Sequence, residues 1–435
     1  MKNSTLYKVL VVFGFILLHA CENESQYSLH NKNNPKHRKY DSTSSYLTNP
    51  INGYPINDAK EYGDDLNSNK INVKIKGVEK NAIDLSPPVI FNIDEPKLIK
   101  TNGIINFRVN NEEIEKRVID SNKIGPKKNI FGKKSDAKLT RIKTKLPLLT
   151  DSKPPIYKGK SIKNIKYLDV KQGTNSSYIW DVYMDSRNQM WMGTNGGGVS
   201  VYTGDKFRHY TKENGLGDDF VWCIEEDKNG NMWFGTWEGG VSMFDGNHFF
   251  KLGFNEDLEG KNIKFIYEDS DGVIWIGSKE KGVYKYNGKS IVSIGKKEGL
   301  LGNMTTCIME DDLKRKWIGT ENGITILDGK KATYLTTEHG LKSNEINKIT
   351  QDKKGRVWIA YADGGLDVLK GDLLSYYSTD NILPNNNVYD LLEGPMGSIW
   401  IATYGGGLCK LNENECIWLN ESNGMSGAHV LCIDH

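Results

Sequence analysis

The chain has 435 residues and a formal net charge of +2, so its overall charge gives no reason to expect nucleic acid as a partner. Hydrophobic residues make up 37%, too few for a protein with many membrane spans, and only 12 prolines exclude a proline-rich chain. Residues 1–170 hold eight of the 45 glycines and none of the ten tryptophans. This uneven distribution argues against one uniform globular domain.

Residues 1–20 have the pattern of an export signal. Lys2 and Lys8 precede the apolar run Val9–Leu18, which is shorter than the roughly 20 residues of a membrane-spanning helix. Ala20 and Cys21 follow. A small residue before a cysteine at the end of an apolar run resembles a bacterial lipoprotein signal, which implies cleavage before Cys21 and acylation of that residue. The alternative is a plain signal peptide with a chance cysteine.

Residues 21–150 are rich in Asn, Lys, Ser and Asp, and their apolar residues come in short islands without a helical period. We therefore expect a low-complexity, largely disordered tether with a few short strands at most. Residues 121–170 carry 14 Lys/Arg and three Asp/Glu, a local charge of +11. A solvated flexible linker is the favoured interpretation, and binding to an acidic surface or to anionic lipid headgroups is the alternative.

A tryptophan recurs through the second half of the chain at spacings of 42, 42, 42, 41 and 42 residues. The six copies are Trp191, Trp233, Trp275, Trp317, Trp358 and Trp400. Six residues before each lies an aspartate, except in the last copy, which has Gly394. So strict a period indicates a repeat architecture.

Each repeat unit contains four short strand patterns separated by turns. In the second unit these are residues 220–225, 232–236, 241–244 and 248–251, and Gly230 lies where a tight turn needs a positive φ. Four strands in about 40 residues, repeated around an axis, are typical of a β-propeller blade. We predict an all-β propeller over residues 151–435, with each repeated tryptophan packed between neighbouring blades.

The repeat resembles the two-component regulator propeller family, found in extracytoplasmic sensor regions of bacterial histidine kinases and hybrid two-component systems. The residues that carry this resemblance in the second unit are Gly215, Leu216, Val221, Ile224, Glu226, Asp227, Gly230, Trp233, Gly235, Thr236, Gly239 and Gly240. Their counterparts recur through about residues 165–435. The resemblance implies a sensor role with a histidine kinase or another signalling protein as partner.

The ends of the repeat region are incomplete. Ile165–Val170 aligns with a fourth strand and Val430–Asp434 with a first strand, which leaves six full blades between them. Two alternatives follow. The two ends pair as a partial seventh blade, or the chain is a fragment of a longer protein that continues past His435.

Loops at one end of the blades are the expected binding site, because they vary between copies while the scaffold does not. In a propeller, the loops after the second strand and before the first strand lie on the same face around the central channel. Aromatic rings beside carboxylates and amides suit a carbohydrate, which would stack on the rings. The candidate ligand-binding residues are Trp237, Glu238, Asp218, Asp219, Asn262, Glu321, Tyr361, Asp363 and Tyr404.

Other chemistry has little support in the sequence. The eight histidines lack metal-ligand spacing and no nucleophile elbow occurs, so neither a metal, a cofactor nor an enzyme activity is expected. Cys223, Cys307 and Cys432 share one repeat position and are predicted to be buried near the axis. Cys409 and Cys416 lie symmetrically about a turn, where an exported protein could form a disulfide.

The sequence favours a lipid-anchored, ligand-binding sensor propeller in the bacterial cell envelope, periplasmic or at the outer-membrane surface. We expect an oligosaccharide as the ligand. The alternatives are a propeller enzyme resembling the streptogramin lyases and a surface scaffold that binds other proteins without a small ligand.

Overall fold

The computed structural model describes residues 70–71, 74–75, 78–79, 83–84, 105–108, 114–120, 123–125, 127–153, 155, 168–254, 262–413, 415–421 and 425–434. The chain divides into two compact units, one of which comprises residues 16–105. In that unit β1 (Lys70–Ile71) pairs with β4 (Ile83–Asp84), and β2 (Lys74–Ile75) pairs with β3 (Val78–Glu79). The predicted signal peptide and Cys21 lie outside the described residues.

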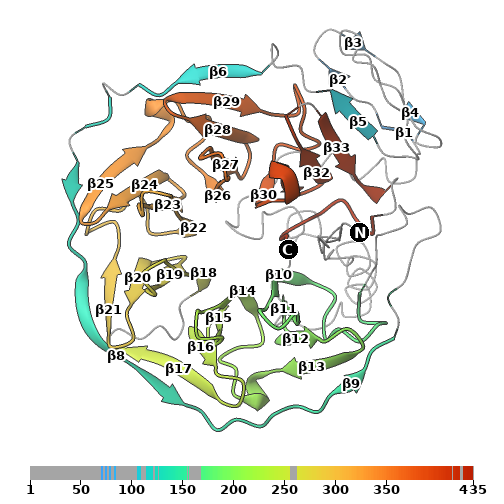
Figure 1. Cartoon of the computed structure of the whole chain (residues 1–435), viewed down its shortest axis with the longest axis vertical. Coiled ribbons are helices and arrows are strands. Elements are labelled where there is room, and N and C mark those ends of the chain that lie inside the picture. The colour runs from blue at the N-terminus through green and yellow to red at the C-terminus, as the bar shows by residue number, and fades with distance from the viewer. Residues whose placement is uncertain are drawn as a thin grey trace, which may run out of the picture. The chain divides into compact units, whose positions relative to one another are not determined.

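Residues 168–434 of the other unit form, in their described part, six four-stranded antiparallel sheets that follow one another around an axis as propeller blades (Figure 1). Consecutive strands pair within each blade, and the first strand of each is innermost. The strands of blades 1 to 3 are β10 (Ile179–Met184), β11 (Met190–Thr194), β12 (Val199–Tyr202), β13 (Lys206–Tyr210), β14 (Val221–Glu226), β15 (Met232–Thr236), β16 (Val241–Phe244), β17 (Phe249–Phe254), β18 (Ile263–Glu268), β19 (Ile274–Ser278), β20 (Gly282–Tyr286) and β21 (Ser290–Ile294). Those of blades 4 to 6 are β22 (Thr305–Glu310), β23 (Lys316–Thr320), β24 (Gly323–Asp328), β25 (Lys331–Leu335), β26 (Ile346–Gln351), β27 (Val357–Tyr361), β28 (Leu366–Lys370), β29 (Leu373–Tyr377), β30 (Val388–Glu393), β31 (Ile399–Thr403), β32 (Gly407–Leu411) and β33 (Glu415–Leu419).

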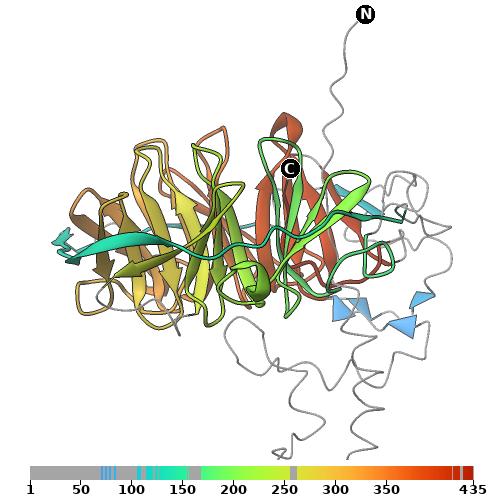
Figure 2. The same cartoon turned by 90° about the horizontal axis from the view of Figure 1, so that it is seen from below.

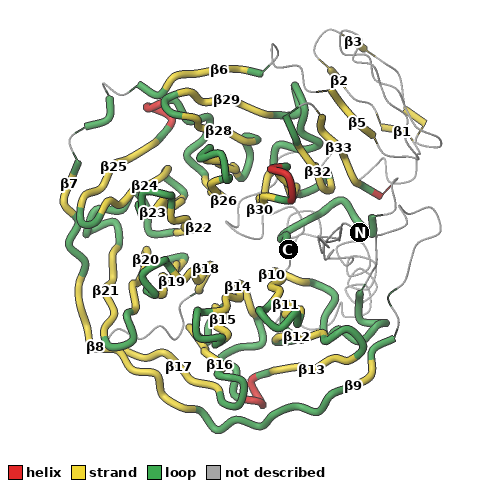
Figure 3. Tube along the Cα trace, in the orientation of Figure 1, coloured by secondary structure: helices red, strands yellow, loops and turns green. Residues whose placement is uncertain are grey.

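The propeller fold and the strand pattern predicted for the second unit are confirmed; two strands have the predicted boundaries, and those of the other two differ by one to three residues. Helical structure in the described residues is confined to three single 3-10 turns, η1 (Lys212–Asn214), η2 (Thr337–His339) and η3 (Pro395–Gly397) (Figure 3). In this described part, no helix has the length and apolar character needed to cross a membrane.

The repeated tryptophans pack between blades, as predicted. Trp191 of blade 1 lies 5.7 Å from Phe234 and 6.3 Å from Phe244 of blade 2, measured between ring centroids. Its indole N–H donates to Asp185 at 2.9 Å, and the corresponding bonds in blades 2 to 5 measure 2.8–2.9 Å. Each aspartate also accepts backbone N–H groups of the turn that follows it. Inter-blade packing and hairpin geometry are therefore joined at one side chain.

A fifth, outermost strand is added to every blade by the part of the chain that precedes the propeller. β5 (Ile105–Arg108) joins blade 6, and β6 (Glu115–Val118) joins blade 5. The remaining outer strands are β7 (Lys128–Asn129) on blade 4, β8 (Lys133–Arg141) on both blades 3 and 2, and β9 (Thr150–Asp151) on blade 1. We call strands β6–β9 the girdle, because they follow the outside of the ring in the reverse order of the blades (Figures 1 and 2).

The girdle alters the domain boundary expected from sequence. The propeller was expected to begin at residue 151 and residues 21–150 to form a largely disordered tether, yet residues 115–151 contribute strands to the ring. Part of the basic stretch, namely Lys128–Asn129, Lys133–Arg141 and Thr150–Asp151, is therefore edge strand instead of flexible linker. Strand β8 alternates exposed Lys134, Asp136 and Lys138 with half-buried Ala137 and Leu139, which pack on the core of blades 2 and 3. Lysines on an outer strand also hinder pairing with further chains.

The C-terminal segment lies between blades 6 and 1. Val430 N–H donates to the Thr403 carbonyl of blade 6 at 3.0 Å, while Asp434 accepts the Met184 N–H of blade 1 at 2.5 Å. Cys432 packs with Ile179 of blade 1. The predicted first strand at Val430–Asp434 therefore occupies an inner position but forms no ladder. The predicted leading strand is not observed at residues 168–170, and its residues 165–167 lie outside the described part.

One buried ion pair attaches the girdle to blade 5. Arg117 of β6 donates to Asp367 of β28 at 2.5 Å and to the Gly340 carbonyl at 2.7 Å. The Asp367 side chain has no exposed surface, and its other oxygen accepts the Tyr361 hydroxyl and the Lys342 N–H. The Arg117 guanidinium is therefore the cationic partner of this buried carboxylate.

We expect Arg117→Ala to lower the free energy of unfolding by about 3 kcal/mol, because it leaves the Asp367 carboxylate buried without its cation. Lys116→Ala is the matched control, since Lys116 is the exposed neighbour on the same strand. Chemical denaturation followed by tryptophan fluorescence measures both variants. Equal stability of the two would contradict a role for this pair in holding the girdle.

Candidate functional site

The two sets of loops chosen from sequence lie side by side on one face of the propeller. In all six blades, the first residue after the second strand donates its backbone N–H to the residue that precedes the first strand of the same blade. Trp237 donates to the Phe220 carbonyl at 3.0 Å, and Tyr404 donates to the Asn387 carbonyl at 2.9 Å. Each blade therefore contributes two neighbouring residues to this face, the donor and the acceptor of this bond, and their side chains differ from blade to blade.

A bulge in every inner strand presents one further residue at this face. The register shifts between the first and third residues of each inner strand, so the second residue has no partner on the neighbouring strand. Bulges of this kind redirect a side chain and recur beside functional sites. The six residues at this position are Trp180, Trp222, Lys264, Thr306, Asn347 and Tyr389.

Aromatic rings gather around this position at blades 6, 1 and 2. Trp180 lies 4.1 Å from Trp222 between ring centroids, and Trp222 stacks on Trp237 at 5.5 Å. Tyr178, Tyr389, Tyr404 and His429 extend the group towards blade 6 through centroid contacts of 4.2–5.5 Å. We call these seven residues the axial aromatic cluster. Trp237 is 40% exposed, which makes it an accessible stacking surface.

Polar atoms without hydrogen-bond partners border the cluster. The Lys264 ammonium lies 3.2 Å from the centroid of the Trp222 ring, a cation–π contact, and has no hydrogen-bond acceptor. Nearby in the repeat, Trp222 Nε1 and Asn262 Oδ1 are also buried without partners. Buried polar atoms without partners are costly, so a ligand that supplies a donor and an acceptor here would offset part of that cost.

Burial and proximity shift the titration of several groups in the cluster. Burial raises the pKa of Tyr178, and the Tyr404 phenol adds to the effect. Tyr389 has its pKa raised in the same way, with Tyr404 and Tyr178 as its neighbours, so the three phenols lie close together. Burial lowers the pKa of His429 to about 4, which keeps its imidazole neutral at physiological pH. Around neutral pH the cluster therefore presents neutral rings and hydroxyl groups.

The three candidate carboxylates on blade 2 have different environments. Asp218 is buried and accepts the backbone N–H groups of Asp219 at 2.7 Å and Glu238 at 3.0 Å. Asp219 accepts the Lys212 N–H at 2.8 Å. These bonds fix the loops beneath Trp237, so Asp218 and Asp219 position the site without presenting a free carboxylate. Glu238 is exposed beside them.

The remaining candidates do not all reach the binding face. Tyr361 is fully buried and donates its hydroxyl to Asp367 at 2.5 Å, so the prediction that it lines the rim is corrected: it belongs to the core. Asp363 is exposed on the loop after β27. Asn262 and Glu321 each hold one buried oxygen without a partner, on blades 3 and 4. The structure therefore brings Trp237 and Tyr404 into the axial aromatic cluster.

A layer of mostly charged and thiol side chains lies next to the bulge, one residue further along the inner strands, with Phe265 at this position in blade 3. Cys223, Cys307 and Cys432 are buried there, as predicted. Asp181, Lys348 and Asp390 occupy the same repeat position, and the Lys348 ammonium contacts Asp390 at 2.8 Å. Burial raises the pKa of Asp181 to about 8, and the carboxylates of Asp390 and Asp434 add to this effect. The described residues contain no group of three or more His, Cys, Asp or Glu arranged to hold a metal.

The predicted disulfide between Cys409 and Cys416 is not formed, and both residues are buried free thiols. The register pairs Leu411 with Cys416 and Cys409 with Trp418. The two cysteines are therefore diagonal neighbours across the hairpin, where the Cα separation of about 7 Å exceeds that of a relaxed disulfide.

Comparison with known proteins agrees with the repeat architecture. Residues 173–196, 215–238, 257–280, 340–363 and 382–405 match the two component regulator propeller family. The fourth unit, around Trp317, lies between the matched segments. No curated protein matches the chain.

Several solved structures are similar to the chain. The extracellular domain assigned to the hybrid two-component system BT3049 of B. thetaiotaomicron is 29% identical, with a TM-score of 0.49 over 54% of this chain and 32% of that domain. The extracellular domain assigned to the one-component system BT4673 of B. thetaiotaomicron is 19% identical, with a TM-score of 0.38 over 55% and 43%. Virginiamycin B lyase from Staphylococcus aureus is 13% identical, with a TM-score of 0.46 over 64% and 86%. The chain thus covers less than half of each of the first two domains.

The sequence reasoning missed Tyr178, Trp180, Trp222, Lys264 and Tyr389. The available signal was the 42-residue spacing between Trp180 and Trp222, which marks a repeat position distinct from the packing tryptophan. A bulge is a backbone feature and leaves little trace in side-chain patterns, so the shared position could not be assigned to the binding face.

Lys264 provides a test of the cluster by pH. Burial, with Lys279 nearby, lowers its pKa to about 7, so the folded state releases a proton that the unfolded state keeps up to about pH 10.5. The buried cation therefore destabilises the fold most below pH 7, and this cost declines as the pH rises towards 10.5. We expect Lys264→Met to raise the free energy of unfolding by roughly 3 kcal/mol at pH 6 and by much less at pH 10.

Denaturation at a series of pH values measures this difference. Lys289→Met is the control, because Lys289 is exposed in the turn before β21, and its effect should not vary with pH. A pH-independent difference between Lys264→Met and the unmodified protein would contradict burial of a titrating amine.

Proposed function

We propose that this propeller is the ligand-binding module of an extracytoplasmic, two-component-type signalling system, and that its ligand is a glycan bound at the axial aromatic cluster. The observation that supports this most directly is the stack of Trp180, Trp222 and exposed Trp237, bordered by unpartnered polar atoms. Stacked rings suit the apolar faces of sugar units, and unpartnered donors and acceptors suit hydroxyl groups. Binding, without a catalytic step, is the proposed role.

The family of the repeats supports the signalling part of this proposal, because it is named for regulators of two-component systems. A ligand that bridges blades 6, 1 and 2 would touch the C-terminal segment through His429, which contacts Tyr404 at 4.2 Å between ring centroids. Ligand binding would then alter the contacts at the junction between blade 6 and blade 1. A histidine kinase or another signalling protein would read this change as the partner.

Trp237→Ala tests the binding face. We expect this variant to bind the glycan at least about tenfold more weakly, because it removes the exposed stacking surface. Oligosaccharides released from neutral and acidic polysaccharides serve as probes, first in a thermal-shift screen and then by calorimetry. Leu313→Ala is the control, since Leu313 is 72% exposed at the opposite ends of the strands. No melting shift with any saccharide, together with retained capture of a protein partner, would favour the scaffold alternative.

We propose a lipid anchor at Cys21 as the second part of this function, which places the propeller in the bacterial cell envelope. An anchored chain would keep the sensor near the membrane where its partner lies. Cys21→Ser should move the protein from the membrane fraction to the soluble fraction and abolish labelling by a radioactive fatty acid. Glu22→Gln, which keeps the cysteine, should remain membrane-bound. A labelled or membrane-bound Cys21→Ser variant would contradict acylation at this residue.

A further inference from the structure

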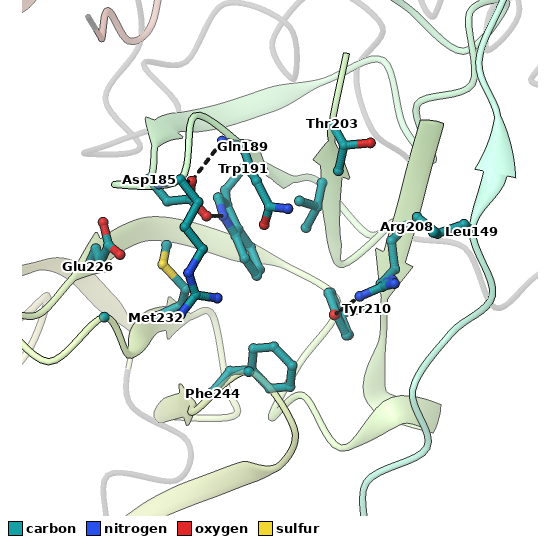
Figure 4. Close-up of a pocket in the computed structure, with 14 residues that line it drawn as sticks. Leu149, Asp185, Gln189, Trp191, Thr203, Arg208, Tyr210, Glu226, Met232 and Phe244 are labelled. Carbon is teal, nitrogen blue, oxygen red and sulfur yellow. Dashed lines mark hydrogen bonds between the residues drawn. The ribbon is translucent and has the colours of Figure 1, made fainter. Parts of the chain in front are cut away.

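A second candidate site lies between blades 1 and 2, at the opposite ends of the strands from the axial aromatic cluster. It is a cavity of about 230 Å³ bordered by Asp185 and Gln189 of the turn before β11 (Figure 4), whereas Tyr178 and Trp180 of the cluster lie at the start of β10. Trp191, Tyr210, Phe244 and Met232 form its apolar wall, and Arg187 and Arg208 also line it. Nothing in the proposed function uses this cavity.

In blades 3 to 6 a cation lies over the repeated tryptophan, whereas in blade 2 the residue opposite Trp233 is Met243. Lys285 and Lys410 are paired directly opposite Trp275 and Trp400 in the sheet register, and their ammonium groups lie 4.6 and 5.2 Å from the ring centroids. Arg315 and Arg356 cover Trp317 and Trp358 at 5.8 and 5.1 Å. In blade 1 the residue opposite Trp191 is Val201. Val201 is shorter and neutral, so it places no cation over Trp191, which lines the cavity with 4% of its surface exposed.

Both arginines of the cavity depart from the repeat. The counterparts of Arg208 on the fourth strands of the other blades are all uncharged, namely Phe250, Val292, Thr333, Ser375 and Ile417. At the position of Arg187, four residues before the repeated tryptophan, the other blades have Asn229, Asp271, Leu313, Lys354 and Met396. Blade 1 alone combines two guanidinium groups at these positions.

The unused hydrogen-bonding capacity of the cavity is cationic. Asp185 already accepts the Trp191 indole at 2.9 Å and the backbone N–H groups of Gln189 and Arg187 at 2.7 and 3.0 Å. Glu226 accepts both the N–H and the hydroxyl of Ser186 at 2.7 Å. Arg208, by contrast, makes one long bond of 3.4 Å to the Tyr210 hydroxyl, and its Nε is buried without a partner. The free donors therefore belong to the guanidinium groups.

We propose that this cavity binds a small organic monoanion, a carboxylate with an apolar body, whose charged end meets Arg208 and Arg187. A guanidinium presents two parallel donors that match a carboxylate. The apolar body would contact those parts of Trp191, Phe244 and Met232 that line the cavity. Asp185 and Glu226 lie in the same wall and repel additional negative charge, so a monoanion is favoured over a polyanion.

Calorimetry on the full chain tests this proposal with 3-phenylpropionate, indole-3-acetate and octanoate as probes. The amide of each acid is the matched control, because it keeps the shape and removes the charge. We expect at least one carboxylate to bind and its amide not to bind. Binding of none of the three acids, or equal binding of an acid and its amide, overturns the proposal.

Three variants locate the binding. Arg208→Gln should weaken binding of the carboxylate by at least about tenfold. Arg187 is exposed, so Arg187→Gln should weaken binding to a smaller extent without affecting folding. Val201→Lys should block binding by placing a cation over Trp191, as Lys285 and Lys410 do in their blades. Arg141→Gln, on exposed β8, is the guanidinium control and should bind like the unmodified protein. If Arg208→Gln and Val201→Lys both bind like the control, the site lies elsewhere and the proposal fails. Glycan binding at the opposite face is measured separately, so the two proposals can fail independently.

Discussion

The hydrogen bond between the repeated tryptophan and the aspartate six residues before it is the interaction on which the propeller depends. One carboxylate oxygen caps the hairpin turn and the other holds the indole, which in turn packs against the next blade. Local turn geometry and long-range stacking are thus fixed together. Blade 6 shows what the bond requires: Gly394 replaces the aspartate, and Trp400 Nε1 is buried without a partner. A Cβ at Gly394 would lie 2.7 Å from that nitrogen, so the backbone has moved into the space of the missing side chain.

The sequence was sufficient to predict the blades but not the girdle. The period of 41 or 42 residues, the aspartate before each tryptophan and the turn glycines specify side-chain packing, which leaves a strong pattern in sequence. The girdle pairs chiefly through its backbone, and strands such as β7 and β9 have only two residues, so little alternation is visible. The lysines of the girdle favoured the interpretation as a solvated linker, because most of them are exposed. The decisive contact, Arg117 with Asp367, joins residues 250 positions apart.

The candidate site was predicted only in part for a related reason. Loop position identified Trp237 and Tyr404, which do join the axial aromatic cluster. Tyr361 comes one residue earlier in the repeat, as the last residue of β27, where Thr236 and Thr403 end the corresponding strands. Its side chain lies in the core, where Asp367 accepts its hydroxyl. Trp222 and Lys264 could not be placed, since the bulge that presents them is formed by backbone register. In a repeat protein the recurring residues predict the scaffold. The site depends on residues that differ between copies and on which of them lie in contact in the fold.

Blade 2 makes this last point concrete, because it contributes to both candidate sites. Trp222 and Trp237 join the cluster at one end of its strands, and Met232 and Phe244 line the cavity at the other. Between them Val221, Phe234 and Phe249 are fully buried, so the two sites are separated by packed core. Close packing of this kind resists small displacements and moves as a unit. A ligand at either end would therefore act on the other only by shifting blade 2 against its neighbours, and the girdle strand β8, which is paired to blades 2 and 3 together, opposes such a shift.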